Sequence, residues 1–210
     1  MIMMDNKIKH IPRIFKMYVA DAPLSWLMLC AGAYIISPLA IAVVDQTNLI
    51  TSAPVAASFL NEYPLINNLF LLGHIAFAVT ALVIMPFQFN ATLRGSRPRL
   101  HRTLGRIYVI ACVIAGVCGL WLAIGTQAGL VAMFGFGLLA LIWIYATVQA
   151  YVTARARNIA QHKRWMIRSG ALTFAAVTLR LYLGVGVVTG GEFEAIYALV
   201  AWACWVPNLI

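Results

Sequence analysis

Six long apolar stretches dominate this chain and limit the folds that are open to it. Each holds roughly 17 to 25 mostly apolar residues, and a helix needs roughly 20 such residues to cross the hydrocarbon core of a bilayer. Strands are a poor alternative, because the stretches are too long and lack the apolar–polar alternation of a membrane β-barrel. The sequence therefore predicts an all-α fold, a polytopic membrane helical bundle of about six transmembrane helices. The predicted spans are about 24–44, 65–89, 104–126, 129–152, 166–188 and 194–210.

The composition supports a membrane location and argues against several other classes of protein. Of the 210 residues, 63% are hydrophobic and only 10% are charged, whereas soluble domains have about 45–50% apolar and about 25% charged residues. So few charges cannot cover a surface in water. A soluble enzyme, a disordered chain and a nucleic-acid-binding domain are all poor interpretations, despite the formal net charge of +9.

The basic residues predict the orientation of the spans. Fourteen of the fifteen lysines and arginines lie in three segments, which are the N-terminal segment and the connections that follow spans 65–89 and 129–152. The intervening connections carry none of them and hold four of the six acidic residues. Because short loops rich in Lys and Arg stay on the inner side of a membrane, the pattern places the N-terminus inside.

Residues 1–23 are predicted to form a separate lead-in before the membrane domain at 24–210. The segment from Lys7 to Tyr18 is basic and amphipathic, which is typical of a helix that lies in the interface of an anionic leaflet. A solvated basic tail is the alternative. We therefore expect a lipid bilayer with anionic inner-leaflet lipids as the partner, and no nucleic acid.

Two ionisable residues lie deep inside the predicted spans, away from the span ends, where such residues are costly and often functional. Counted from the outer surface at 1.5 Å per residue, His74 lies roughly 10 Å deep and Arg180 roughly 12 Å deep. The Arg180 guanidinium can donate hydrogen bonds to backbone carbonyls, to Glu192 or Glu194, or to outer headgroups. It can also donate to a ligand oxygen, such as that of a haem propionate or a quinone. His74 can form a hydrogen bond between helices, or it can contact a ligand, including as an axial ligand of haem.

The neighbours of these two residues predict polar faces directed toward the centre of the bundle. At helical spacing, one face of span 166–188 contains Ser169, Thr173, Ala176, Arg180 and Gly184. A similar face of span 65–89 contains His74, Ala78, Ala81, Met85 and Gln88. Small residues recur along span 104–126 and predict close packing of helices; they are Gly105, Cys112, Gly116, Gly119 and Ala123.

Two further histidines lie at the inner ends of spans, each among arginines. His101 begins the stretch His-Arg-Thr-Leu-Gly-Arg, and His162 begins His-Lys-Arg-Trp-Met-Ile-Arg-Ser. Contact with lipid phosphates is one interpretation. The other is a pair of histidines that clamps a cofactor at the inner surface, with carboxylates neutralised by arginines such as Arg102 and Arg168. Since His74 lies roughly 22 Å along its helix from the inner end, it cannot join the other two around one metal ion. The metal ligands considered are therefore haem axial ligands only: His74, His101 and His162.

Six motifs between roughly residues 65 and 210 form a specific set. They are Gly73-His74-Ile75, Met85-Pro86-Phe87-Gln88-Phe89, His101-Arg102-x-Leu104-Gly105-Arg106-x-Tyr108, His162-x-x-Trp165-Met166-Ile167-Arg168-Ser169, Thr178-Leu179-Arg180 and Trp205-Val206-Pro207-Asn208. This set resembles a family of bacterial predicted inner-membrane proteins of unknown function. The resemblance implies a multi-pass protein of the bacterial inner membrane, and it marks the residues to test: His74, His101, Arg102, His162, Arg168, Arg180 and Asn208. A looser similarity is to cytochrome b-type membrane haem proteins, although this chain offers no two histidines at one depth on two spans.

Three functions remain open at this point. The first is a non-catalytic accessory subunit or lipid-contacting module of a larger membrane complex, with the tryptophans as packing and interfacial anchors. The second is a membrane redox protein that binds b-type haem or quinone, through His74 and Arg180 in the outer half or through His101 and His162 at the inner face. The third is a small transporter, which lacks the support of broken helices in matched repeats. The sequence ranks the module slightly above the redox protein.

Overall fold

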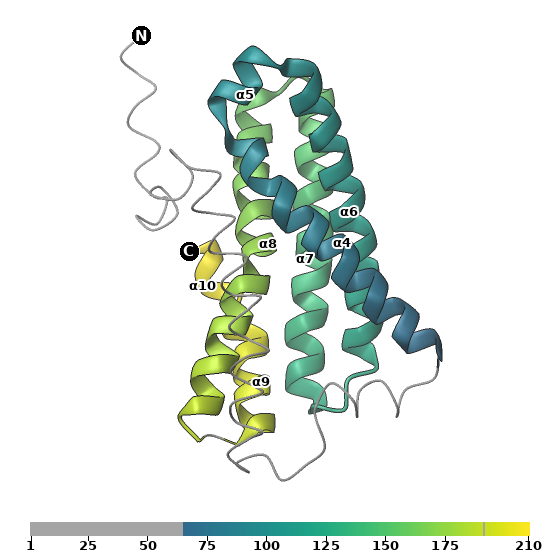
Figure 1. Cartoon of the computed structure of the whole chain (residues 1–210), viewed down its shortest axis with the longest axis vertical. Coiled ribbons are helices and arrows are strands. Elements are labelled where there is room, and N and C mark those ends of the chain that lie inside the picture. Colours follow the sequence, from purple (N-terminus) through teal and green to yellow (C-terminus); the bar gives the residue numbers. More distant parts are fainter. Residues whose placement is uncertain (1–64, 191) are drawn as a thin grey trace.

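The computed structural model describes residues 65–190 and 192–210, and every regular element in that part of the chain is an α-helix. The predicted lead-in at 1–23 and the predicted span at 24–44 lie outside the described residues. Figure 1 shows the helices, which are α4 (Leu65–Phe89), α5 (Ala91–Ser96), α6 (Pro98–Ile124), α7 (Gly129–Arg155), α8 (Ile159–Val188), α9 (Phe193–Ala203) and α10 (Val206–Leu209).

Four of the described helices are long and apolar enough to cross a membrane. They are α4, α6, α7 and α8, with 25, 27, 27 and 30 residues, and each exceeds the roughly 20 residues that a span requires. The chain is therefore an integral membrane protein with several transmembrane helices. This finding confirms the prediction of an all-α polytopic membrane bundle.

Three of the long helices extend along the same axis, and the fourth crosses them obliquely. In Figure 1, α6, α7 and α8 extend along the long dimension of the molecule, while α4 leans across them. The end of α4 reaches α8, because a Cβ built on Gly170 would lie 3.0 Å from the ring of Phe89. The beginning of α4 packs instead on the far end of α6, where a Cβ on Gly119 would lie 3.0 Å from His74. The crossing therefore separates the first half of α4 from α8.

Local capping signals explain why several of the helices begin where they do. Asn90 accepts a hydrogen bond from the Leu93 amide (2.8 Å) and caps α5, and Pro98 opens α6, a position where its missing N–H costs nothing. Asn158 accepts from the Gln161 amide (3.1 Å) at the start of α8. These turns place both basic connections at one end of the bundle, because α6 and α7 form an antiparallel pair.

The last predicted span, 194–210, is not one continuous helix, so this part of the prediction was wrong. The structure divides it into α9, with 11 residues, and α10, with four. At 1.5 Å per residue α9 extends roughly 16 Å, about half of a hydrocarbon core. Pro207 explains the break: in a continuous helix its ring would clash with the carbonyl of Ala203, the last residue of α9.

Small residues allow the helices to approach closely, as the pattern along span 104–126 predicts. A Cβ on Gly116 would lie 2.5 Å from Ile144 Cγ1 of α7, and one on Gly105 would lie 3.0 Å from Gln88 Oε1 of α4. Cys112 and Ala123 are buried. Since lipid supplies no hydrophobic force between helices, such close backbone contact is the usual source of their association.

Gly135 on α7 provides a test of this packing. We expect Gly135→Ala to destabilise the bundle by about 1–3 kcal/mol, the usual cost of overpacking, because its Cβ would lie 2.9 Å from both the Cβ and the backbone oxygen of Ala201 in α9. Thermal unfolding in detergent measures the effect. Gly184→Ala on α8 is the control, since no atom lies within 4 Å of its Cβ; a loss of stability as large in the control would contradict the packing argument.

Candidate functional site

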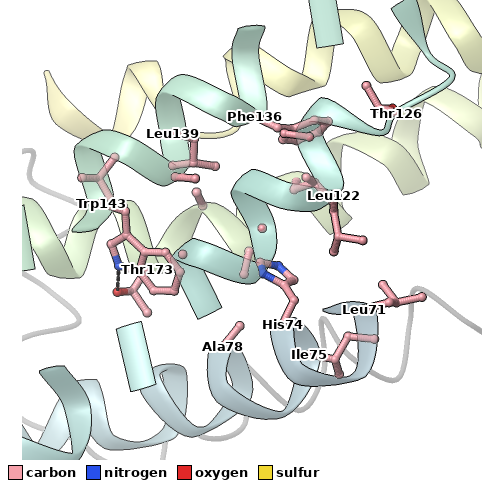
Figure 2. A pocket seen from close by; sticks show the side chains of 18 of the residues that line it. Leu71, His74, Ile75, Ala78, Leu122, Thr126, Phe136, Leu139, Trp143 and Thr173 are labelled. Atoms are coloured by element: carbon pink, nitrogen blue, oxygen red, sulfur yellow. Dashed lines mark hydrogen bonds between the residues drawn. The ribbon is translucent and has the colours of Figure 1, made fainter. Parts of the chain in front are cut away.

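A cavity of about 350 Å³ lies inside the bundle between α4, α6, α7 and α8, with Tyr197 of α9 at its edge. Its lining includes residues near the end of α6, such as Leu122 and Thr126, so it lies in the half of the bundle opposite the basic end. Most of the lining is apolar, including Phe136 and Leu139 of α7. Figure 2 shows His74 projecting from α4 toward this space, and Trp143 with Thr173 at one side of it.

His74 is held by a hydrogen bond to a neighbouring helix. Its Nδ1 lies 2.8 Å from the backbone oxygen of Ala115 in α6, and because a carbonyl can only accept, Nδ1 carries the proton. In the neutral ring, Nε2 then keeps its lone pair and can accept a hydrogen bond or ligate a metal. Gly119 leaves the room for the ring, since a Cβ there would lie 3.0 Å from Nδ1. The structure therefore shows the hydrogen bond between helices, which was one of the two alternatives for His74, and places the ring at the cavity.

Arg180 lines the same cavity from α8. Its Nη1 donates to the backbone oxygen of Ala176 at 2.7 Å, so a backbone carbonyl of its own helix meets part of its hydrogen-bonding capacity. The residue is half-buried, and His74 lines the same cavity from α4. The structure therefore brings the two intramembrane ionisable residues to one cavity, as their similar predicted depth implies.

The two predicted faces point into the bundle along most of their length. On α8, Thr173, Ala176 and Arg180 line the cavity, and Ser169 is completely buried. Gly184 is the exception, since a Cβ there would meet no atom within 4 Å. On α4, the first part of the face lines the cavity, with His74 and Ala78. The later part is buried in the core, with Ala81, Met85 and Gln88.

A network of buried hydroxyl groups joins α6, α7 and α8 beside the cavity. The Tyr108 hydroxyl lies 2.8 Å from both Ser169 Oγ and Thr173 Oγ1, and Thr147 Oγ1 lies 2.6 Å from Ser169 Oγ. Trp143 Nε1 donates to Thr173 Oγ1 at 2.9 Å, the contact drawn in Figure 2.

The donors and acceptors of this network can be assigned in one consistent order. Thr173 donates its proton to the Ser169 backbone oxygen (2.8 Å), so it must accept from Tyr108. Tyr108 then accepts from Ser169, which in turn accepts from Thr147, because each hydroxyl has one proton to give. Every hydroxyl is satisfied, and Thr173 is fixed at the wall of the cavity. Sequence reasoning identified Ser169 and Thr173 but missed their partners on α6 and α7.

The two histidines at the basic end lie in the first turns of two helices, His101 in α6 and His162 in α8. His162 Nδ1 lies 2.8 Å from the Ala150 backbone oxygen of α7. His101 lies in the first turns of α6, before the apolar part that spans the membrane. Burial, followed by the positive charges of Arg94, His162 and Arg102, lowers the pKa of His101 below its ordinary value. This lowered pKa favours the neutral ring of His101.

The remaining residues marked by the motifs have different surroundings. Arg102 and Arg168 are exposed, and the Arg168 guanidinium lies 4.7 Å from the ring centroid of Trp165, a cation–π contact. Asn208 Nδ2 lies 3.2 Å from the Ala171 backbone oxygen and 2.9 Å from that of Cys204. Asn208 therefore ties α10 to α8 and to the residue that follows α9.

Comparison with known proteins gives one match. A model of the family described as predicted membrane protein (DUF2306) matches residues 71–210. No curated protein and no solved structure gives a significant match. The match supports the predicted resemblance to a family of membrane proteins of unknown function, over nearly the extent that the motifs suggested.

Proposed function

We propose a ligand-binding role for this chain, which belongs to the DUF2306 family of predicted membrane proteins. The ligand is a lipid-soluble molecule with a ring and a carbonyl or carboxylate oxygen, of which a quinone is the best-fitting class. The observation that carries the proposal is that His74 and Arg180 converge on one cavity of about 350 Å³ whose lining is otherwise mostly apolar. A volume of this size falls in the range of ligand pockets, about 300–1,000 Å³.

The chemistry of the lining matches such a ligand. Arg180 can donate to a carbonyl or carboxylate oxygen, and charge-assisted hydrogen bonds of this kind are strong where water is excluded. The neutral His74 ring offers Nε2 to a hydroxyl group, as in a reduced quinone. Phe136 and Trp143 supply aromatic surface for a flat ring. We therefore place a redox role, with quinone as the cofactor, ahead of simple packing.

Haem is the other ligand that the same residues can hold. A histidine that ligates a metal usually donates its second ring nitrogen to a carbonyl or carboxylate, and His74 makes such a bond with Ala115. Arg180 would then face a propionate. The two ligands differ in their visible spectra, so one experiment separates them.

The test uses the full chain purified in detergent from cells that contain both haem and quinone. We expect a stoichiometric quinone in the organic extract, and loss of most of it in His74→Leu. Thr80→Val on α4 is the matched control, because the Thr80 hydroxyl donates to the Ala76 backbone oxygen of its own helix. A Soret band that shifts on dithionite reduction would assign haem instead. A preparation without either ligand would overturn the proposal.

An accessory subunit of a larger membrane complex is the second candidate. This candidate is favoured by the low burial of α4. Only 17% of the apolar segment of α4 is buried by the described chain, compared with 33–44% for α6, α7 and α8. A helix that the other described helices cover so little can receive a partner helix. The bacterial inner membrane remains the proposed location, with the basic end of the bundle on the cytoplasmic side. Stoichiometric copurification of a second membrane protein would support this candidate.

A further inference from the structure

We propose that the basic end of the bundle contains a second binding site, for a phosphate group, where the end of α4 meets the start of α6. This site lies at the opposite end of α6 from the cavity and does not depend on the proposed function. The phosphate can be the headgroup of an anionic lipid or a free phosphate, since both present the same oxygens.

Two buried polar atoms at this place have no hydrogen-bond partner in the part of the chain that the structure describes. They are Gln88 Nε2 and His101 Nδ1. Gln88 is only 7% exposed, and its Oε1 packs against Gly105, where a Cβ would lie 3.0 Å away. Gly105 lies one helical turn after His101 on the same face of α6, so both unsatisfied atoms belong to one contact between α4 and α6.

The chemistry of these atoms selects an acceptor. An amide nitrogen can only donate, so the partner of Gln88 Nε2 must be an acceptor atom. His101 can donate from Nδ1 in one of its two neutral tautomers. Buried polar atoms without partners are rare in folded proteins and call for an explanation, such as a bound ion. Acceptor oxygens from outside the described helices would satisfy Gln88 Nε2 and the donating tautomer of His101.

The charges around the site select an anion. Arg94, Arg102 and His162 act electrostatically on His101, and no acidic residue occurs between Glu62 and Glu192 in the sequence. The helices that form the site therefore supply no carboxylate to balance these charges. A phosphate carries several acceptor oxygens and negative charge, and arginine is the residue best suited to it. The edge of the membrane is also where lipid phosphates lie.

The experiment measures lipid binding to the delipidated full chain in detergent by native mass spectrometry. The probes are phosphatidylglycerol, phosphatidylcholine and inorganic phosphate as a competitor. We expect phosphatidylglycerol to bind more tightly than phosphatidylcholine, and Gln88→Leu and Arg94→Gln each to weaken it by about tenfold, as expected for the loss of one charge-assisted contact. Arg155→Gln is the matched control: it removes the same charge from an exposed position in the last turn of α7.

Each outcome decides the proposal or the source of the phosphate. Displacement of phosphatidylglycerol by inorganic phosphate would show that free phosphate occupies the site, whereas retention would assign the lipid headgroup. Equal weakening by Arg94→Gln and Arg155→Gln, with no effect of Gln88→Leu, would show only diffuse attraction and overturn the site. Thermal unfolding shows whether Gln88→Leu is misfolded. If it is, Arg94→Gln still tests the site, because Arg94 is exposed and its replacement does not disturb the core.

Discussion

Arg180→Leu is expected to lose the cavity ligand while the protein still inserts and folds. A hydrogen bond to a charged group contributes about 1.5–3 kcal/mol, which corresponds to roughly a 10- to 100-fold loss of affinity. Arg180 lies at the cavity, and its Nη1 donates to the Ala176 backbone oxygen of its own helix. The leucine would therefore remove the proposed ligand contact, and the hydrogen bond lost with Nη1 lies within α8. The measurement is ligand content per protein after purification, followed by titration of the stripped protein with a short-chain quinone.

Arg164→Leu is the control for this variant. Arg164 is an exposed arginine on the same helix, at the basic end of the bundle, so its removal changes the net charge equally but leaves the cavity intact. We expect its ligand content to equal that of the wild type. An unchanged ligand content in Arg180→Leu would mean that Arg180 only reaches toward the outer headgroups, and the proposed ligand contact would be abandoned.

Tyr108→Phe is expected to destabilise the bundle about as strongly as overpacking at Gly135. Tyr108 is completely buried, and its hydroxyl contacts Ser169 and Thr173 at 2.8 Å. Hydrogen bonds between membrane helices contribute about 0.6 kcal/mol on average and up to about 1.7 kcal/mol, so the loss of two predicts a destabilisation of about 1–3 kcal/mol. Unfolding by heat or by SDS titration measures it.

The change is confined to one oxygen atom, so the phenyl ring of the variant would keep the packing of the tyrosine. Tyr151→Phe is the matched control, because Tyr151 is exposed on α7, and it should leave stability nearly unchanged. If Tyr108→Phe were as stable as this control, the hydroxyl network would not contribute to joining the helices. The position of the hydroxyl network at the wall of the cavity would then need another explanation.

The spans could be predicted from the sequence more accurately than the ends of the helices. Hydropathy identified 65–89 with the bounds of α4, but α6 begins at Pro98 and α8 at Ile159, well before the predicted spans. The charged residues at the end of an apolar stretch do not end the helix. In α6 and α8 the helix continues through these residues, beyond the apolar stretch. The caps at Pro98 and Asn158 were the signals that could have corrected these two starts.

The candidate site was only partly predictable for a physical reason. His74 and Arg180 can be identified from a single sequence, because an ionisable side chain inside an apolar span is costly whichever helices pack around it. Hydroxyl groups do not stand out, since a membrane helix can satisfy them by itself, as Thr80 does with Ala76 at 2.8 Å. Whether Tyr108 bonds across helices depends on which helices pack together, and no local pattern contains that information.

The break between α9 and α10 has a further consequence, because it leaves a helix terminus within an apolar segment of the chain. Carbonyl oxygens at such a terminus have no water to bond with. Side chains from the following turn replace it: Trp205 Nε1 donates to the Ala201 oxygen at 2.9 Å, and Asn208 Nδ2 donates to the Cys204 oxygen at 2.9 Å. The backbone amide of Asn208 also donates to the Trp205 oxygen at 3.1 Å. Asn208 thus supplies hydrogen bonds that water would otherwise provide, so the chain can turn here while its carbonyl oxygens stay bonded within the protein.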